Sequence, residues 1–178
     1  MPLEISSVLI SQEQIREKVL QLGAEINERY RGQELVVVGI LKGAVFFLSD
    51  LARALEPELD VSFDFMSVSS YGSATESSGV VRILKDLDSD VRGKHVLIVE
   101  DIVDSGLTLA YLLQLLRQRK PASLGVCALL DKPERRRVEV PIDFRGFVIP
   151  DAYVVGYGLD AAGKWRHLPE IHTVVSRS

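Results

Sequence analysis

Three uninterrupted apolar stretches, each about one strand long, constrain the fold of this chain more than any other feature. They lie within residues 35–40, 95–100 and 124–130. Such runs are typical of strands that are covered on both faces, because a strand with one wet face alternates instead. Residues 43–55 and 108–119 have helical patterns and separate the three stretches. Strand–helix–strand repeats with right-handed crossovers build a parallel sheet, so we expect an α/β fold with a central parallel sheet flanked by helices.

The remaining segments add elements around that sheet. Ser11 and Gln14 form a capping-box pattern, and Ile15 and Val19 continue one apolar helical face, which predicts a helix ending at Gly32. Short strands are predicted at 61–68, 80–84, 144–148, 153–157 and 171–175, and a loop rich in Ser and Gly at 69–79. We expect a single domain over 1–178, with the terminal segments forming a small hood at the edge of the sheet.

The composition argues against several classes of protein and site. The net charge is −4, so no global basic field is available to hold nucleic acid or an anionic membrane. The single cysteine, Cys127, excludes an intrachain disulfide and is interpreted as a buried strand residue. The sequence shows no signal-peptide pattern and no apolar run near the roughly 18 residues of a membrane span, which makes the cytoplasm the default compartment. The three histidines have no zinc-ligand spacing.

The densest polar cluster follows the second apolar stretch. Glu100 and Asp101 end that strand, and Asp104, Ser105 and Gly106 lead into the next helix. Ligands of open parallel sheets bind beyond the carboxyl ends of the strands, and a glycine turn before a helix presents N–H groups and a partial positive charge to phosphate. Neighbouring carboxylates suit a divalent metal or sugar hydroxyls. The alternative is an acidic turn in which Asp104 or Ser105 only caps the helix.

The full motif is more specific than its parts: an apolar strand, two acids, two apolar residues, a third acid, Ser-Gly and, one residue later, Thr108. It resembles the phosphoribosyl pyrophosphate (PRPP) signature of type I phosphoribosyltransferases, and its residues are similar to the form of this motif in the hypoxanthine-guanine branch. Residues 41–43 resemble the family's pyrophosphate loop, 70–71 the start of its mobile catalytic loop, 130–136 and 147–160 its purine-binding segments, and 166–169 the motif after them. The resemblance covers most of the chain. It implies Mg²⁺-dependent transfer of phosphoribosyl from PRPP to hypoxanthine or guanine, giving IMP or GMP and pyrophosphate.

The resemblance also implies a PRPP site. Glu100 and Asp101 would engage the ribose hydroxyls, directly or through Mg²⁺, and Asp160 would be a further metal ligand. Backbone groups of 104–108 would cradle the 5′-phosphate, although Leu107 replaces a polar residue of many relatives. Lys42 and Arg166 would bind pyrophosphate, next to a cis peptide that is common in the family. The residues expected around PRPP are Lys42, Gly43, Glu100, Asp101, Asp104, Ser105, Gly106, Leu107, Thr108 and Arg166.

The purine side of the site follows in the same way. Asp104 would be the catalytic acid-base residue that faces the purine imidazole. Lys132 would donate to the 6-oxo group, since an ammonium group is only a donor, and would thereby favour 6-oxopurines over adenine. Tyr153 would stack on the base, with a core aromatic as the alternative interpretation. The expected purine-binding residues are Lys132, Tyr153, Val154 and Asp160, and the mobile loop would open at Ser70 and Tyr71.

Some features depart from the family or have other interpretations. Ala161 stands where an aromatic residue commonly follows the metal-binding Asp, and residues 135–137 are interpreted as a solvated charged turn. Taken without the family resemblance, Lys42 is better interpreted as an exposed lysine at a helix start. The alternatives to the implied activity are a xanthine-preferring transferase and a non-catalytic nucleotide-binding regulator on the same fold. A receiver-like or hydrolase-like domain would explain the acids at the strand end but not the later base-binding segments. The family usually forms dimers or tetramers, so we expect a homodimer or homotetramer.

Overall fold

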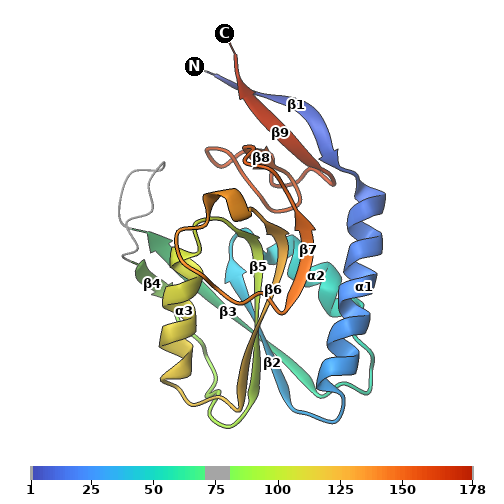
Figure 1. Cartoon of the computed structure of the whole chain (residues 1–178). Coiled ribbons are helices and arrows are strands. Elements are labelled where there is room, and N and C mark those ends of the chain that lie inside the picture. Colours follow the sequence, from blue (N-terminus) through green and yellow to red (C-terminus); the bar gives the residue numbers. More distant parts are fainter. Residues whose placement is uncertain (1, 71–80, 178) are drawn as a thin grey trace.

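The computed structural model describes residues 2–70 and 81–177, which form two sheets (Figure 1). The main sheet has the strand order β4-β3-β2-β5-β6-β7. Its strands β2, β3, β5, β6 and β7 run parallel, while β4 pairs antiparallel at one edge. The predicted central parallel sheet is therefore confirmed. Its strands are β2 (Leu35–Leu41), β3 (Val61–Ser70), β4 (Val81–Lys85), β5 (His95–Val103), β6 (Ser123–Asp131) and β7 (Phe144–Val148).

Helices cover both faces of this sheet, with α1 (Gln12–Tyr30) and α2 (Val45–Arg53) on one face and α3 (Leu107–Arg117) on the other (Figure 1). Successive residues of a strand point to opposite faces. Val37 accordingly packs in the core cluster that contains Phe47 of α2, whereas Val38 packs in the cluster that contains Leu112 of α3. Both faces are dry, which is why the central strands show apolar runs without alternation.

The helix boundaries follow local signals closely. Gln14 N–H donates to Ser11 Oγ at 3.1 Å and Ser11 N–H donates to Gln14 Oε1 at 2.8 Å, so the predicted capping box of α1 is confirmed. The helix ends at Tyr30, with Arg31 as its C-cap, two residues before the predicted end at Gly32. The helices predicted at 43–55 and 108–119 are observed as α2 and α3, each displaced by one or two residues at its ends.

The two ends of the chain meet in a second sheet of order β1-β9-β8. β1 (Leu3–Ile10) pairs antiparallel with β9 (Ile171–Ser176), which also pairs with β8 (Val154–Val155). This sheet lies beyond the end of the main sheet at which the parallel strands finish, with the termini side by side (Figure 1). β8 is shorter than the predicted strand 153–157 because the chain turns at Gly156 and Gly158, both at φ +100°. The single domain over 1–178 and the hood role of this sheet stay predictions.

Further expectations concern single features. Cys127 is fully buried in β6, where burial raises the pKa of its thiol, as expected for a strand residue and not for a nucleophile. Within 2–70 and 81–177, no helix is long and apolar enough to cross a membrane. The predicted loop at 69–79 falls mostly outside the described residues, and so does Tyr71. Ser70 is the last residue of β3.

Candidate active site

The carboxyl end of β5 carries two acids, of which Glu100 is buried and Asp101 is partly buried. Glu100 is 8 % exposed, and burial, together with the neighbouring charge of Asp101, raises its pKa well above the usual range. Burial also raises the pKa of Asp101 to about 6, although the Ile102 N–H at 2.7 Å from Asp101 Oδ1 and the charge of Arg166 favour the ionised form. Acids at a strand end whose ionisation is opposed by burial are candidates for binding a cation or hydroxyl groups.

Asp160 lies close enough to Asp101 for its charge to raise the pKa of that carboxyl. Asp160 Oδ1 also lies 3.0 Å from Arg166 Nη2, and Asp160 Oδ2 accepts the Gly163 N–H at 2.7 Å. No preformed group of three or more acidic, His or Cys ligands occurs in the described part of the chain. Mg²⁺ is usually bound by one or two carboxylates together with substrate phosphates and water. The carboxylates of Asp101 and Asp160 therefore fit Mg²⁺.

The glycine turn after β5 lets a ligand approach the protein backbone closely. Gly106 has φ +85° and is the N-cap of α3, so the interpretation of Asp104 or Ser105 as the cap is wrong. Ser105 Oγ instead accepts the Leu107 N–H at 3.3 Å. A Cβ on Gly106 would lie 2.9 Å from the Val138 carbonyl oxygen. Only glycine therefore fits this turn, and the start of α3, which contains Thr108, presents the N–H groups and partial positive charge that attract phosphate.

A charged segment lies directly behind this turn. The prediction of a solvated turn at 135–137 is wrong for Arg136, whereas Arg135 and Arg137 are exposed as expected. The Arg136 side chain is 13 % exposed, forms an ion pair with buried Asp131 and donates from Nε to the Asp104 carbonyl at 3.1 Å. The N–H groups of Arg137 and Val138 donate to the Ser105 carbonyl at 2.8 and 3.3 Å. Two consecutive residues of the turn are thus held by one neighbouring segment.

Asp104 and Lys132 stand on neighbouring strand ends and share a small charge cluster. The Lys132 N–H donates to the Val103 carbonyl at 3.0 Å, which places the two residues at the same edge of the sheet. Arg135 Nε lies 3.2 Å from Asp104 Oδ1 and forms an ion pair with it, while this oxygen has no hydrogen-bond partner among the described residues. Asp151 Oδ1 lies 3.6 Å from Arg135 Nη1 and 3.8 Å from Lys132 Nζ. Sequence reasoning missed Arg135 and Asp151, since only the folded chain brings these charges together.

Tyr153, the predicted stacking residue, lies in the segment before β9. Tyr153 is 50 % exposed, so the interpretation as a core aromatic is wrong, and its ring is accessible for stacking. Its carbonyl accepts the Val174 N–H at 2.9 Å. Val154 is buried in β8 and pairs with Thr173. Strand pairing to β9 therefore fixes the backbone that presents the Tyr153 ring.

The predicted pyrophosphate loop packs directly against the acids. The Leu41–Lys42 peptide bond is cis, at the place the family resemblance implies, and Lys42 is exposed. A Cβ on Gly43 would overlap the Asp101 carboxylate, and a Cβ on Gly158 would overlap the Gly43 carbonyl. Arg166 Nη1 donates to the Gly158 carbonyl at 2.5 Å. The structure thus brings the loop at 42–43, Asp101 and the 158–166 segment together.

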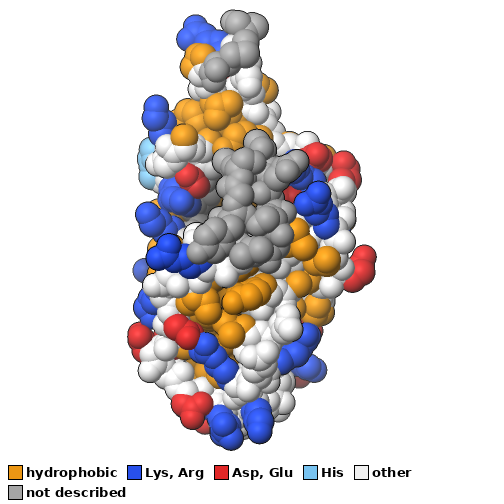
Figure 2. Space-filling model, turned by 90° about the vertical axis from the view of Figure 1, so that its left-hand side faces the viewer, with side chains coloured by type: hydrophobic (Ala, Val, Ile, Leu, Met, Phe, Trp, Pro, Cys, Tyr) orange, Lys and Arg blue, Asp and Glu red, His pale blue; other side chains and the backbone are white. Residues whose placement is uncertain are grey.

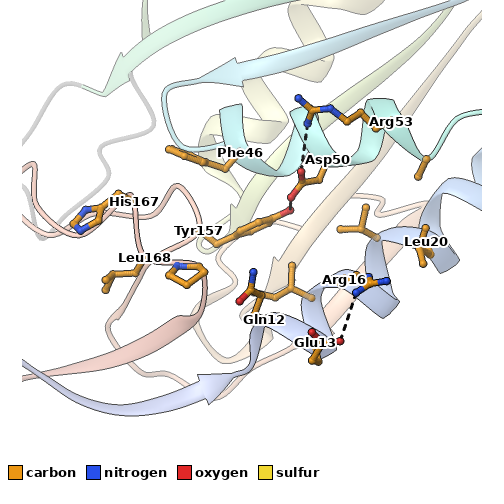
Figure 3. A pocket seen from close by; sticks show the side chains of 14 residues that line it. Gln12, Glu13, Arg16, Leu20, Phe46, Asp50, Arg53, Tyr157, His167 and Leu168 are labelled. Carbon is orange, nitrogen blue, oxygen red and sulfur yellow. Dashed lines mark hydrogen bonds and ion pairs between the residues drawn. The ribbon is translucent and has the colours of Figure 1, made fainter.

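Tyr157 links this segment to α2 in a way that sequence reasoning missed. Its hydroxyl donates to Asp50 Oδ2 at 2.6 Å, and burial and this hydrogen bond raise its pKa (Figure 3). The two residues line a cavity of about 510 Å³ between α1, α2 and the 157–169 segment, and none of the predicted site residues lines it. The Tyr157–Asp50 bond therefore ties the predicted base-binding segment to the helix that follows Lys42 and Gly43, outside the predicted site itself.

Comparison with known proteins agrees with this geometry. Residues 11–162 match the phosphoribosyl transferase domain family. The chain is 54% identical to a hypoxanthine-guanine phosphoribosyltransferase of Mycobacterium avium, over 99% of this chain and 89% of that protein. It is 51% identical to the hypoxanthine phosphoribosyltransferase of Escherichia coli, over 94% of both. A crystal structure of a Bacillus anthracis hypoxanthine-guanine phosphoribosyltransferase superposes with a TM-score of 0.91 at 47% identity, covering 98% of this chain and all of that one. The chain therefore belongs to the phosphoribosyl transferase domain family.

Proposed function

We propose that this chain is a hypoxanthine-guanine phosphoribosyltransferase, which transfers phosphoribosyl from PRPP to hypoxanthine or guanine and releases pyrophosphate. The observation that carries the proposal is the arrangement at the end of β5: buried Glu100 and partly buried Asp101, then a glycine turn into the start of α3, with Lys132 on the adjacent strand end. The names of the relatives support the same reaction.

PRPP would lie along the edge of the sheet formed by these strand ends. The 5′-phosphate binds at the turn 104–108, where N–H groups and the helix end provide the attraction. Glu100 and Asp101 face the ribose hydroxyls. Lys42 and Arg166 hold the pyrophosphate, for which a guanidinium is geometrically suited. When bound beside Asp101 and Asp160, Mg²⁺ would neutralise charge on the leaving pyrophosphate.

The base would lie between Lys132 and the Tyr153 ring. Lys132 donates to the 6-oxo oxygen, and an amino group at that position offers no acceptor. Asp104 removes the proton from the imidazole nitrogen that attacks ribose C1, while the C1–oxygen bond breaks and its electrons leave with pyrophosphate. In the resting structure Asp104 is paired with Arg135, so this ion pair has to open or rotate to admit the base.

The assembly proposed is a homodimer or homotetramer working in the cytoplasm, without a nucleic-acid partner. Large apolar side chains support self-association: Val45 of α2 and Phe63 of β3 are 39 % and 43 % exposed and line one shallow pocket. Apolar side chains also gather at the surface in Figure 2, below the segment drawn in grey. The formal charge of −4 agrees with the absence of a nucleic-acid role.

The direct test is product analysis with PRPP, Mg²⁺ and hypoxanthine. The proposal predicts equimolar IMP and pyrophosphate, and GMP when guanine replaces hypoxanthine. Xanthine in a third reaction tests the alternative acceptor. Release of pyrophosphate without a nucleotide, or a marked preference for xanthine, would contradict the proposal.

A further inference from the structure

Arg136 is bound at both ends of its guanidinium by groups that shape the turn after β5. On one side it forms an ion pair with Asp131, whose side chain is 4 % exposed. On the other, Arg136 Nε donates to the Asp104 carbonyl at 3.1 Å. A guanidinium presents donors in a fixed plane, so it can serve a carboxylate and a carbonyl at the same time, which the compact ammonium of lysine does not do with the same geometry.

The backbone that follows Arg136 reinforces the same contact. The N–H groups of Arg137 and Val138 donate to the Ser105 carbonyl, and the space beside Gly106 is filled by the Val138 carbonyl and the Arg136 Cδ. The carbonyls of Asp104 and Ser105 are therefore turned toward 136–138. When consecutive carbonyls of a turn are fixed on one side, its following N–H groups are directed to the other, toward the start of α3.

We propose that Arg136, held by Asp131, is a positioning residue that sets the 5′-phosphate turn in its binding conformation. The inference rests on the proposed function, because that function assigns the turn to the 5′-phosphate. Arg136 acts through the backbone and does not touch the substrate. The pyrophosphate end of the site, at Lys42 and Arg166, has its own supports and is independent of Arg136.

Arg145 provides a matched control. Its Nε lies 2.8 Å from Asp131 Oδ2, so it pairs with the same carboxylate from β7. In the ranges 2–70 and 81–177, no hydrogen bond or ion pair joins Arg145 to the turn. Asp131 keeps one arginine partner whether Arg136 or Arg145 is replaced, so neither substitution leaves a buried carboxylate without a counter-charge.

The test compares two ligands that occupy opposite ends of the site. Titration calorimetry with Mg²⁺ measures the affinity for ribose 5-phosphate and for pyrophosphate in wild type, Arg136→Met, Arg136→Lys and Arg145→Met. Both Arg136 variants should lose at least about tenfold in affinity for ribose 5-phosphate, the factor expected for one hydrogen bond to a charged group. Their affinity for pyrophosphate should stay within about threefold of wild type, and Arg145→Met should change neither ligand by more than that factor.

Equal losses for both ligands, or no loss, would overturn the positioning role. Thermal unfolding identifies a variant that is not folded at the assay temperature; if Arg136→Met is such a variant, Arg136→Lys decides, and wild-type affinity for ribose 5-phosphate in that variant overturns the inference. If the wild-type protein forms IMP and the Arg136 variants bind ribose 5-phosphate with wild-type affinity, this inference is refuted and the proposed function is not. If ribose 5-phosphate binding depends on Arg136 but the wild-type protein forms no nucleotide, the proposed function is refuted and this inference is not.

Discussion

Asp101→Asn should stabilise the free protein while weakening its site. Asn has the shape of Asp and can still accept the Ile102 N–H, so the substitution removes a partly buried charge without removing the local hydrogen bond. The ordinary pKa of 3.8 and the value of about 6 in the fold imply a penalty of about 3 kcal/mol at pH 7, at 1.36 kcal/mol per pH unit. We expect Asp101→Asn to recover up to this amount, since functional groups are commonly kept at the expense of stability.

The sign of the pH dependence follows from the raised pKa. Between about pH 4 and pH 6 the folded protein holds a proton on Asp101 that the unfolded chain has lost, so wild-type stability falls as pH rises through this window. The advantage of the variant should therefore be about 3 kcal/mol at pH 7, about 1.5 kcal/mol at pH 5 and close to zero below pH 4.

Urea unfolding of both proteins at pH 7 and pH 5, without ligand or metal, measures this difference. Asp60→Asn is the control, because Asp60 is exposed and should show little change at either pH. A variant that is no more stable than wild type at pH 7, or whose advantage is the same at both values, would refute the argument that burial of Asp101 opposes its ionisation.

Two further predictions concern the substrates. Excess chelator should abolish nucleotide formation, with Mg²⁺ restoring it, because Asp101 and Asp160 lie beside the proposed polyphosphate site; full activity in chelator would exclude the metal role. Adenine should be a very poor acceptor in steady-state assays, because its amino group leaves the donors of buried Lys132 unpaired, which costs about 1–3 kcal/mol of binding free energy. Comparable kcat/KM for adenine and hypoxanthine would show that Lys132 does not select the base.

The parts of the structure that the sequence predicts are those that depend on neighbouring residues. The apolar run of β2 and the capping box at Ser11 are local patterns, and each appears where expected. The acids at the end of β5 are also local, because the strand that carries them and the glycine turn that follows are contiguous in sequence. Strand-end chemistry in a parallel sheet is therefore accessible to sequence reasoning.

The missed features depend on contacts between distant residues. β1 has no continuous apolar run, and its partner β9 is more than 160 residues away. Tyr157 and Asp50 are 107 residues apart. The arginines at 135–137 have the sequence pattern of a solvated turn, and only the position of Asp131 at the buried end of β6 makes Arg136 part of the interior. Charge runs do not reveal their partners, because the partners are chosen by tertiary structure.

The most direct test of the account is Asp104→Asn, with kcat and the dissociation constant of PRPP measured on the same protein. Gly106, not Asp104, caps α3, and the Arg136 contact is to the Asp104 backbone, so the substitution should leave the turn intact. If Asp104 handles the purine proton, kcat should fall by about 10²–10⁴-fold. The dissociation constant of PRPP should change by no more than about threefold, well below that range. A kcat within about threefold of wild type would contradict the acid-base role of Asp104, and a collapse of PRPP binding would place Asp104 in the phosphate site instead.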